Sequence, residues 1–574
     1  MKTKQIRQSI LSAAIVAGVS VSAWYGLIRT DSSPATPVAA NDSEKVPAAA
    51  TIVTADAYYS GSATAAPVDV VLAPTLPGKR IVPKLANVTG RAIDLQGEAY
   101  LKSGRTGEKV RGRVSDVDPA ALASLADVAE GDLVSIPTFD GDVQGIVEVA
   151  LVDDAGWRRV GGPIEGDRSK GWFSFGYDGE HATGLVRMNT AKLAYQIEPA
   201  AGGRYQMVER PLADVVCMGL PAFEIPALAA PRRPAAVAAP VVTLIQNSRP
   251  GATAQLFMDF DGENVNDVEW GRINATASPL NATQRVNVFR RVKDDFLCFN
   301  INVTTDVGKY NAAKPGTRMR CIVTTVDTAA PGAGGVAYLN SFAYAGTIFT
   351  KDIPCWCFNP TVKSIADTIS HEVGHTLGLN HDGLVGRAEY FDGQGTGATS
   401  WGPIMGAPFT KLVCQWSKGE YNGANNYEYD IEIIANSVNG FGYAPDDFGD
   451  TTATASPITF VNGNIEQRGV IDKPDDLDVF SFTTAHGGSV LVSASGIGNA
   501  VGNLDCQLET LNAYGVVVGT NKFDNSQGAG LNVLVGPGTS YLRIRGAGDG
   551  KVNGVGYSAY GSRGAYTITG RLPN

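Results

Sequence analysis

The stretch "SIADTISHEVGHTLGLNHDG", residues 364–383, decides the fold of the middle of the chain. Three of the five histidines in the 574 residues fall within it. Apolar side chains recur here every three or four positions, which predicts an amphipathic helix over 362–379 with one buried face. The residues of that face are Val362, Ile365, Ile369, Val373 and Leu377.

The spacing of the histidines indicates a metal site. His371 and His375 are four residues apart, so they lie one turn apart on one helix face and can reach the same metal ion. His381 could not join them on a straight helix, but Gly378 can adopt positive φ, end the helix and turn the chain back. Three neutral imidazoles leave a fourth tetrahedral position for water, as in a catalytic zinc site.

Glu372 follows the first of these histidines and is placed to take a proton from that water. The alternative is a set of surface histidines on an ordinary helix. A bare HExxH occurs often by chance, but "HEVGHTLGLNH" is a longer pattern in a chain poor in histidine, which favours zinc.

This pattern, with Asp382 following it, resembles the signature of the metzincin zinc metalloendopeptidases, of the adamalysin (reprolysin-like) branch in its secreted bacterial form. The resemblance implies that His371, His375 and His381 bind Zn²⁺ and that Glu372 is the catalytic base. It also implies that Met405, in "WGPIMGAPF", forms the structural Met-turn beneath the metal. Protein or peptide substrates would lie extended along an edge strand, for which "GGVAYLNSF" (334–342) is the candidate.

The chain is too long for one hydrophobic core, and its composition and its pattern of apolar residues change along its length. We expect a multidomain protein with an α/β (α+β) catalytic domain, preceded by a β-rich prodomain and followed by an all-β sandwich. The expected segments are a signal peptide (1–23), a linker (24–66), the prodomain (67–225), a hinge with the activation site (226–250), the catalytic domain (251–445) and the sandwich (446–574).

Two further helices are expected in the catalytic domain. "NATQRVNVFRRVKDDFLCF" places Val286, Phe289, Val292 and Phe296 at helical spacing. "YEYDIEIIANSV" repeats that spacing with Tyr427, Ile431, Ile434 and Val438.

The sandwich resembles the bacterial pre-peptidase C-terminal domain, on the stretches "DKPDDLDVFSF" and "GYSAYGSRGAYTITG". Its acidic turn could hold a structural Ca²⁺ through carboxylate oxygens, or could simply be solvated. The turn carries Asp472, Asp475, Asp476 and Asp478.

The N-terminus predicts export. Basic "MKTKQIRQS" precedes the apolar run "ILSAAIVAGVSVSA", although apolar character up to Ile28 leaves an uncleaved anchor open. No later segment is apolar enough to span a membrane, so we expect a secreted, extracellular monomer. The net charge of −10 argues against a nucleic-acid or anionic-membrane partner.

Seven cysteines in an exported chain predict disulfides plus one unpaired thiol. Cys217, in "PLADVVCMGLP", is the one cysteine before residue 298. It could be buried filler, a partner in a distant disulfide, or a thiolate held over the open zinc position. Metzincin proenzymes use such a cysteine switch, which by resemblance makes Cys217 the zinc-blocking residue. Cleavage in the hinge would then free the site, and the hinge contains Arg232 and Arg233, which a trypsin-like protease could cut.

The sequence therefore predicts a secreted zinc endopeptidase made as a zymogen. The alternative is a non-catalytic surface adhesin or binding protein that keeps the metalloprotease fold. The presence of Glu372 and of all three histidines favours the enzyme.

Overall fold

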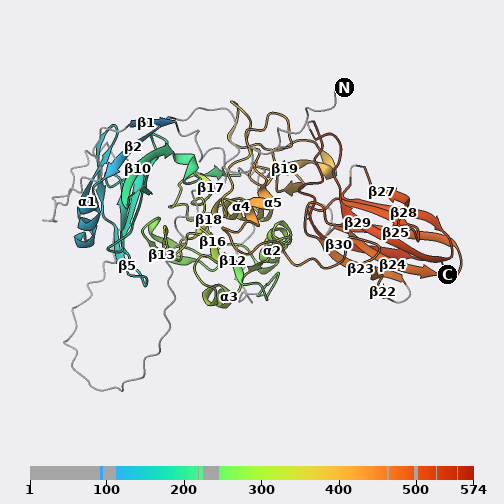
Figure 1. Cartoon of the computed structure of the whole chain (residues 1–574). Coiled ribbons are helices and arrows are strands. Elements are labelled where there is room, and N and C mark those ends of the chain that lie inside the picture. The colour runs from blue at the N-terminus through green and yellow to red at the C-terminus, as the bar shows by residue number, and fades with distance from the viewer. Residues whose placement is uncertain are drawn as a thin grey trace, which may run out of the picture. The chain divides into compact units, whose positions relative to one another are not determined.

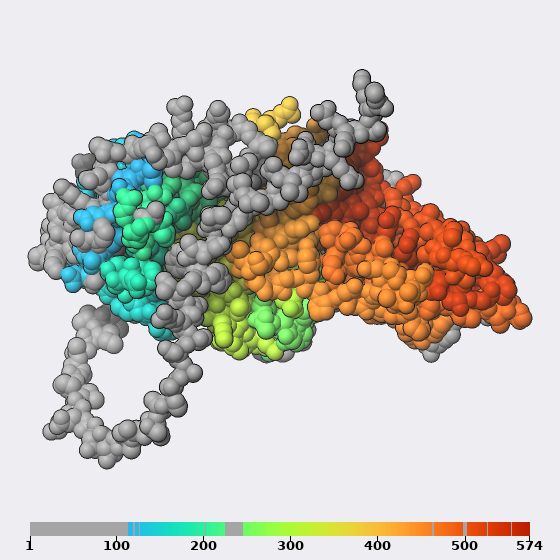
Figure 2. All heavy atoms as spheres, in the orientation of Figure 1, coloured from blue at the N-terminus to red at the C-terminus, as the bar shows by residue number. Residues whose placement is uncertain are grey.

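The structure, a computed structural model, describes residues 91–94, 111–200, 202–217, 219–223, 245–461, 464–496, 502–524, 526–552 and 554–573. These residues fall within the unit Pro74–Asn574, whose helices and strands are labelled in Figure 1. Three predicted segments lie outside the described residues: the signal peptide, the linker and residues 226–244 of the hinge. Figure 2 draws the residues that are not described in grey. Among the described helices, none is long and apolar enough to cross a membrane.

The N-terminal part (residues 91–223) is built on an antiparallel sheet of eight strands. Its inner side chains, such as Phe173, Val186 and Ile197, form a core of their own. A hairpin of β3 (Leu133–Thr138) and β4 (Gly141–Ile146) and a short helix α1 (Pro119–Ala123) contribute to that core. In sheet order the strands are β1 (Arg91–Asp94), β2 (Arg111–Val117), β10 (Arg204–Pro211), β9 (Leu193–Ala200), β8 (Ala182–Met188), β7 (Gly171–Tyr177), β6 (Arg158–Pro163) and β5 (Val149–Val152).

The central part (residues 245–445) holds a six-stranded sheet and the helices packed on it. Four neighbouring strands are parallel, and β17 is antiparallel to them. A short strand of the N-terminal part, β11, is added to the edge beside β17. In sheet order the strands are β11 (Leu220–Pro221), β17 (Ala333–Val336), β18 (Cys355–Cys357), β16 (Arg318–Val323), β12 (Ala254–Asp259) and β15 (Ile301–Thr304).

Smaller elements complete the central part. They are the pairs β13 (Glu263–Asp267) with β14 (Gly271–Ala275) and β19 (Trp401–Pro403) with β20 (Val413–Gln415), and the helices α3 (Val307–Ala312) and α5 (Asp430–Ile434). Helix α5 is much shorter than its periodicity predicts, because the flanking Tyr427 and Val438 are exposed rather than packed on the core.

Helix α2 (Ala282–Asp295) begins at a capping box between Asn281 and Gln284. Phe289 and Val292 are buried as predicted. The third buried apolar residue is Val288, whereas Val286 is only half-buried, so the buried face is rotated relative to the expected one.

Helix α4 (Val362–Thr376) carries the histidine motif. It begins at a second capping box, between Thr361 and Ser364. Its end is a Schellman turn: the Gly378 N–H donates to the His375 carbonyl (2.9 Å) and the Leu379 N–H to the Gly374 carbonyl (3.0 Å). Gly378 has φ +104°, the left-handed conformation expected from the sequence.

The C-terminal part (residues 446–573) consists of two five-stranded sheets that share one buried core, with Phe480 and Leu542 from one sheet and Val490 and Ile568 from the other. One sheet holds β21 (Ser456–Pro457), β24 (Asp478–Thr484), β29 (Gly538–Gly546), β26 (Cys506–Leu511) and β27 (Val517–Asn521). The other holds β22 (Phe460–Val461), β23 (Asn464–Ile471), β30 (Gly564–Arg571), β25 (Gly488–Gly496) and β28 (Gly528–Val535).

The C-terminal part is tied to the central part by buried contacts. Tyr560 lies in the central core, accepts a hydrogen bond from the Ile431 N–H (2.9 Å) and donates to Glu432 (2.6 Å). Asn503 donates its N–H to Asp294 (2.7 Å) and its side-chain amide to Asp295 (2.6 Å). The expected boundary near 446 therefore separates two sets of elements that bury surface against each other.

No disulfide forms among the cysteines. All seven lie in the described part of the chain, and all are buried free thiols. The predicted pairings are thus not present in the structure.

Candidate metal centre

Helix α4 places His371 and His375 side by side in the interior. Their Nε2 atoms are 3.0 Å apart, and both side chains are fully buried. The Nδ1 atom of His371 lies 2.9 Å from the Ile404 carbonyl oxygen, and that of His375 lies 2.8 Å from the Leu379 carbonyl oxygen. A carbonyl oxygen only accepts, so each Nδ1 carries the proton and each Nε2 keeps its lone pair.

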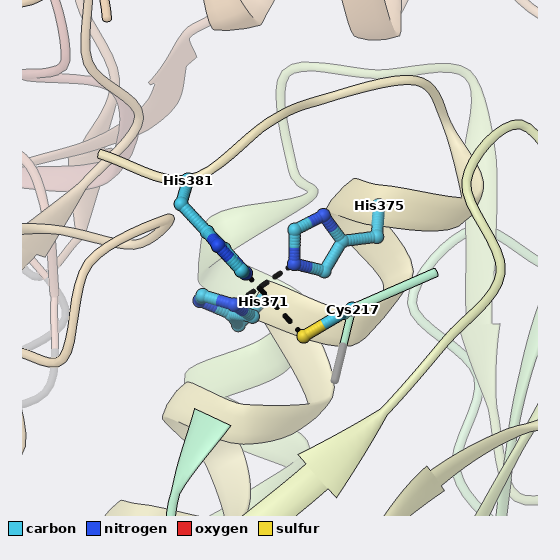
Figure 3. A group of neighbouring side chains, drawn as sticks. All are labelled: Cys217, His371, His375 and His381. Carbon is cyan, nitrogen blue, oxygen red and sulfur yellow. Dashed lines mark hydrogen bonds between the residues drawn. The ribbon is translucent and has the colours of Figure 1, made fainter. Parts of the chain in front are cut away.

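His381 reaches the same point because the chain turns back at Gly378. Its ring centroid is 4.6 Å from that of His375 and 5.4 Å from that of His371. The Nδ1 atom lies 3.1 Å from a carboxylate oxygen of Glu389, which leaves Nε2 facing the other two rings. The structure thus brings together the three histidines that the sequence singles out (Figure 3).

Met405 lies beneath the histidines and is completely buried. A Cβ atom on Gly374 would stand 2.6 Å from its sulfur, so the glycine between the two helix histidines makes room for the thioether. The Met405 carbonyl accepts a hydrogen bond from the Asp382 N–H (2.9 Å) and so holds the segment that follows His381.

Glu372 points into the same site and has no hydrogen-bond partner on either carboxylate oxygen within the described residues, although it is fully buried. Burial raises its pKa well above the ordinary range. A Cβ atom on Gly335, in the edge strand β17, would lie 2.5 Å from its Oε1 atom, so the strand passes directly beside this carboxylate.

Cys217 comes from the N-terminal part, and its sulfur points toward the three histidine rings (Figure 3). Its Sγ atom lies 3.3 Å from His381 Nε2, and the sulfur and one nitrogen of each histidine all lie within 4.8 Å of one another. A thiol over this site is one of the three roles that the sequence leaves open for Cys217, and the structure places the completely buried Cys217 sulfur among the histidines.

The chain around Cys217 is paired with the edge strand. The Cys217 N–H donates to the Ala337 carbonyl (2.9 Å), and the Leu339 N–H donates to the Val215 carbonyl (3.1 Å). Val216 and Tyr338 form an antiparallel bridge, and β11 continues the antiparallel pairing with β17. Residues 215–217 and 219–221 therefore occupy the edge that the sequence assigned to substrate.

The donor set fits a divalent metal ion of the zinc type. Burial, and then the neighbouring His381, lowers the pKa of His371 to about 3, and the same two causes lower the pKa of His375 well below its ordinary value. The imidazoles are therefore neutral, the form that binds metal. Two unprotonated Nε2 atoms 3.0 Å apart repel each other, and a cation between them removes that repulsion.

Two residues of the site carry no signal in the sequence motif. Tyr390 and Glu389 follow His381 by nine and eight residues, and both contact it: the Tyr390 ring centroid is 4.3 Å from that of His381. The sequence signal for Glu389 and Tyr390 is their closeness to His381 along the chain, because a short loop cannot carry them far from that histidine.

A second candidate metal-binding site, made of aspartates, lies in the C-terminal part. Oxygens of Asp446, Asp447 and Asp478 approach one another within 4.8 Å, as do those of Asp446, Asp450 and Asp476. Asp478 and Asp476 belong to the acidic turn expected from the sequence. Asp475 is exposed and outside both groups, and Asp472 is buried with neither oxygen hydrogen-bonded within the described residues.

Comparison with known proteins supports a metalloprotease. Residues 300–382 match the model of metallo-peptidase family M12B, Reprolysin-like, a range that includes α4 and all three histidines. Among solved structures, the chain is similar to the pre-peptidase C-terminal domain of a collagenase from Bacillus anthracis, at 13% identity and a TM-score of 0.15, over 22% of this chain and 95% of that one. No curated protein matches the chain.

Proposed function

We propose that this chain is the latent precursor of a secreted zinc endopeptidase. The observation that carries the proposal is the position of Cys217, whose sulfur lies among the three histidines while its neighbours pair with the edge strand. A buried thiol delivered to a metal centre by a separate part of the chain is what a blocked protease requires.

The chemistry follows from the groups at this point. Zinc, when bound, supplies a Lewis acid that polarises the scissile carbonyl and makes a water more acidic. His371, His375 and His381 would hold it. Glu372 accepts the proton of the attacking water and returns it to the leaving amine as the peptide C–N bond breaks. The backbone of β17 and of the following residues binds an extended peptide by strand addition.

Latency follows from the same contacts. Residues 215–217 and 219–221 fill the proposed substrate edge, and the Cys217 sulfur lies at the position that water needs. Cleavage between 226 and 250, for example at Arg232 or Arg233, would separate this segment from the protease. Arg232 and Arg233 lie outside the described residues.

The test is digestion of casein by the purified full chain, before and after limited trypsin treatment, with and without the zinc chelator 1,10-phenanthroline. We expect an inactive parent that gains chelator-sensitive activity on cleavage. Cys217→Ser should be active uncut or cut itself sooner. Cys506→Ser, which alters a buried thiol in the C-terminal core, should stay as latent as the parent.

Two outcomes would change the conclusion. Activity that appears on cleavage, with equal latency in Cys217→Ser and the parent, would remove Cys217 as the blocking residue. A cleaved parent that binds zinc but hydrolyses no protein would favour the adhesin alternative.

A structural calcium ion in the C-terminal part is a second proposal. Asp478 is fully buried, one of its oxygens has no hydrogen-bond partner within the described residues, and burial raises its pKa to about 9. Such a carboxylate is stabilised by a hard cation with oxygen ligands. We expect millimolar Ca²⁺ to raise the melting temperature of the parent and not that of Asp478→Asn, as measured by differential scanning calorimetry.

A further inference from the structure

Tyr390 lies at the metal centre although it is outside the histidine motif. Its loop is held on both sides: the Phe391 N–H donates to the Asp382 carbonyl (2.7 Å), and Glu389 contacts His381 Nδ1. The tyrosine ring packs at 4.3 Å from the His381 ring and 6.0 Å from the His371 ring, measured between centroids. The phenol is therefore fixed by the same loop that carries a metal-binding histidine.

The Tyr390 hydroxyl contacts the segment that fills the substrate edge. It donates a hydrogen bond to the Gly219 carbonyl (3.0 Å) and lies 3.9 Å from the Cys217 sulfur. Gly219 is two residues beyond Cys217, and this segment runs antiparallel to β17 as an extended peptide would. In the latent form, Tyr390 thus binds a backbone carbonyl of a peptide that lies across the metal centre.

From this geometry we infer that Tyr390 is a catalytic residue, which donates a hydrogen bond to the scissile carbonyl oxygen once residues 215–221 have left. This inference rests on the proposed function. Attack of water on the carbonyl carbon moves an electron pair onto that oxygen. The Tyr390 O–H stabilises the resulting negative charge and keeps its own proton, since Glu372 carries the proton from the water to the leaving amine.

Tyr390→Phe tests the inference, because it removes one oxygen atom and keeps the ring that packs on His381. The variant is made in the full chain, cleaved in the hinge and assayed on a quenched fluorescent peptide. We expect kcat/KM to fall about 10²–10³-fold, mostly in kcat, because the interaction forms as charge develops. Zinc content should equal that of the parent. Tyr514→Phe, at a site that is 90% exposed, is the matched control.

A transition-state analogue separates catalysis from packing. A phosphinic peptide carries a charged oxygen in place of the oxyanion, so Tyr390→Phe should weaken its inhibition by about the same factor as kcat/KM while KM changes little. A role confined to holding residues 215–221 predicts the reverse pattern: an uncut chain that is less latent, with parent-like kcat/KM after cleavage. That pattern would overturn the inference and leave the proposed function standing. A cleaved parent without activity would overturn both.

Discussion

At the scale of single residues, Glu372 is distinguished by what it lacks. Neither carboxylate oxygen has a hydrogen bond of normal geometry within the described residues. Burial raises the pKa of Glu372 against the opposing effect of the Cys217 thiol, which makes its carboxylate a stronger base than that of an exposed glutamate. Glu372→Gln keeps the shape of the side chain and removes that basicity. We expect kcat/KM of the cleaved enzyme to fall about 10²–10⁴-fold, with zinc content unchanged. Near-parent turnover on the fluorescent peptide would exclude Glu372 as the base, and Glu466→Gln in the C-terminal part is the control.

Gly378 decides whether His381 joins the other two histidines. At φ +104° any Cβ atom is strained, and here it would also stand 2.8 Å from the Asn340 side-chain oxygen. Gly378→Ala should therefore displace His381 and weaken zinc binding at least about tenfold, as measured by competition with a chromogenic chelator. Gly440→Ala has a similar φ of +78° and open space around it, so it should lower stability without changing zinc affinity. Equal zinc affinity in Gly378→Ala and the parent would mean that the turn does not set the ligand geometry.

At the scale of elements, local patterns predicted what depends on local sequence. The histidine helix, expected over 362–379, ends at Thr376, and the turn that follows it contains Gly378 at the expected positive φ. Helix α5 is shorter than expected because Tyr427 and Val438, on either side of it, are exposed. The periodicity of the sequence does not reveal which apolar residues pack on the core.

The same distinction between local patterns and long-range contacts applies to the residues of the candidate site. The histidines and Glu372 lie within eleven residues, so their spacing defines them. The pairing of β11 with β17 joins segments more than a hundred residues apart, and Tyr390 reaches the metal centre through a loop with no motif. No local pattern encodes either contact, although the thiol at 217 could be singled out by its chemistry.

A buried carboxylate joins helix α4 to the C-terminal part. Asp295 accepts hydrogen bonds from Ser370, the neighbour of His371 (2.5 Å), and from Asn503 (2.6 Å). Burial raises its pKa to about 8, whereas an unfolded aspartate titrates near pH ~3.9. The folded chain therefore holds a proton that the unfolded chain releases, so this contribution to stability is complete below about pH 4 and is lost as the pH rises through about 8.

Asp295→Asn should reduce that loss, because an amide does not titrate and the Ser370 hydroxyl can turn to accept from it. We expect the fall in melting temperature between pH 5 and pH 8 to be smaller in the variant than in the parent. Asp524→Asn, at an exposed aspartate, should leave the fall unchanged. An identical pH dependence in Asp295→Asn and the parent would show that this carboxyl is not the titrating group.

At the scale of the whole molecule, the metal centre depends on three stretches of chain that are far apart in sequence. The N-terminal part supplies Cys217, the central part the histidines and Glu372, and the C-terminal part the Asn503 contact to the residue that supports α4. Under the proposed function, the first of these leaves before substrate enters, whereas the last fills no part of the proposed substrate edge. We therefore assign opposite roles to the two flanking parts: one blocks the site and the other supports it.

We expect these contacts to make the C-terminal part necessary for the stability of the central part. A chain ending at residue 445 would open the central core where Tyr560 packs and would leave Asp294 and Asp295 without Asn503. Tyr560→Ala in the full chain should cost about 3–5 kcal/mol, as for other large buried aromatics, and Tyr514→Ala no more than about 0.5 kcal/mol. We expect the truncated chain to melt at a lower temperature than the parent, to be digested faster by thermolysin and to hold zinc less tightly. A truncated chain that matches the parent in melting temperature and in peptide hydrolysis after hinge cleavage would show instead that residues 446–574 are a separable appendage and that the buried contacts to Tyr560 and Asn503 add nothing to the active site.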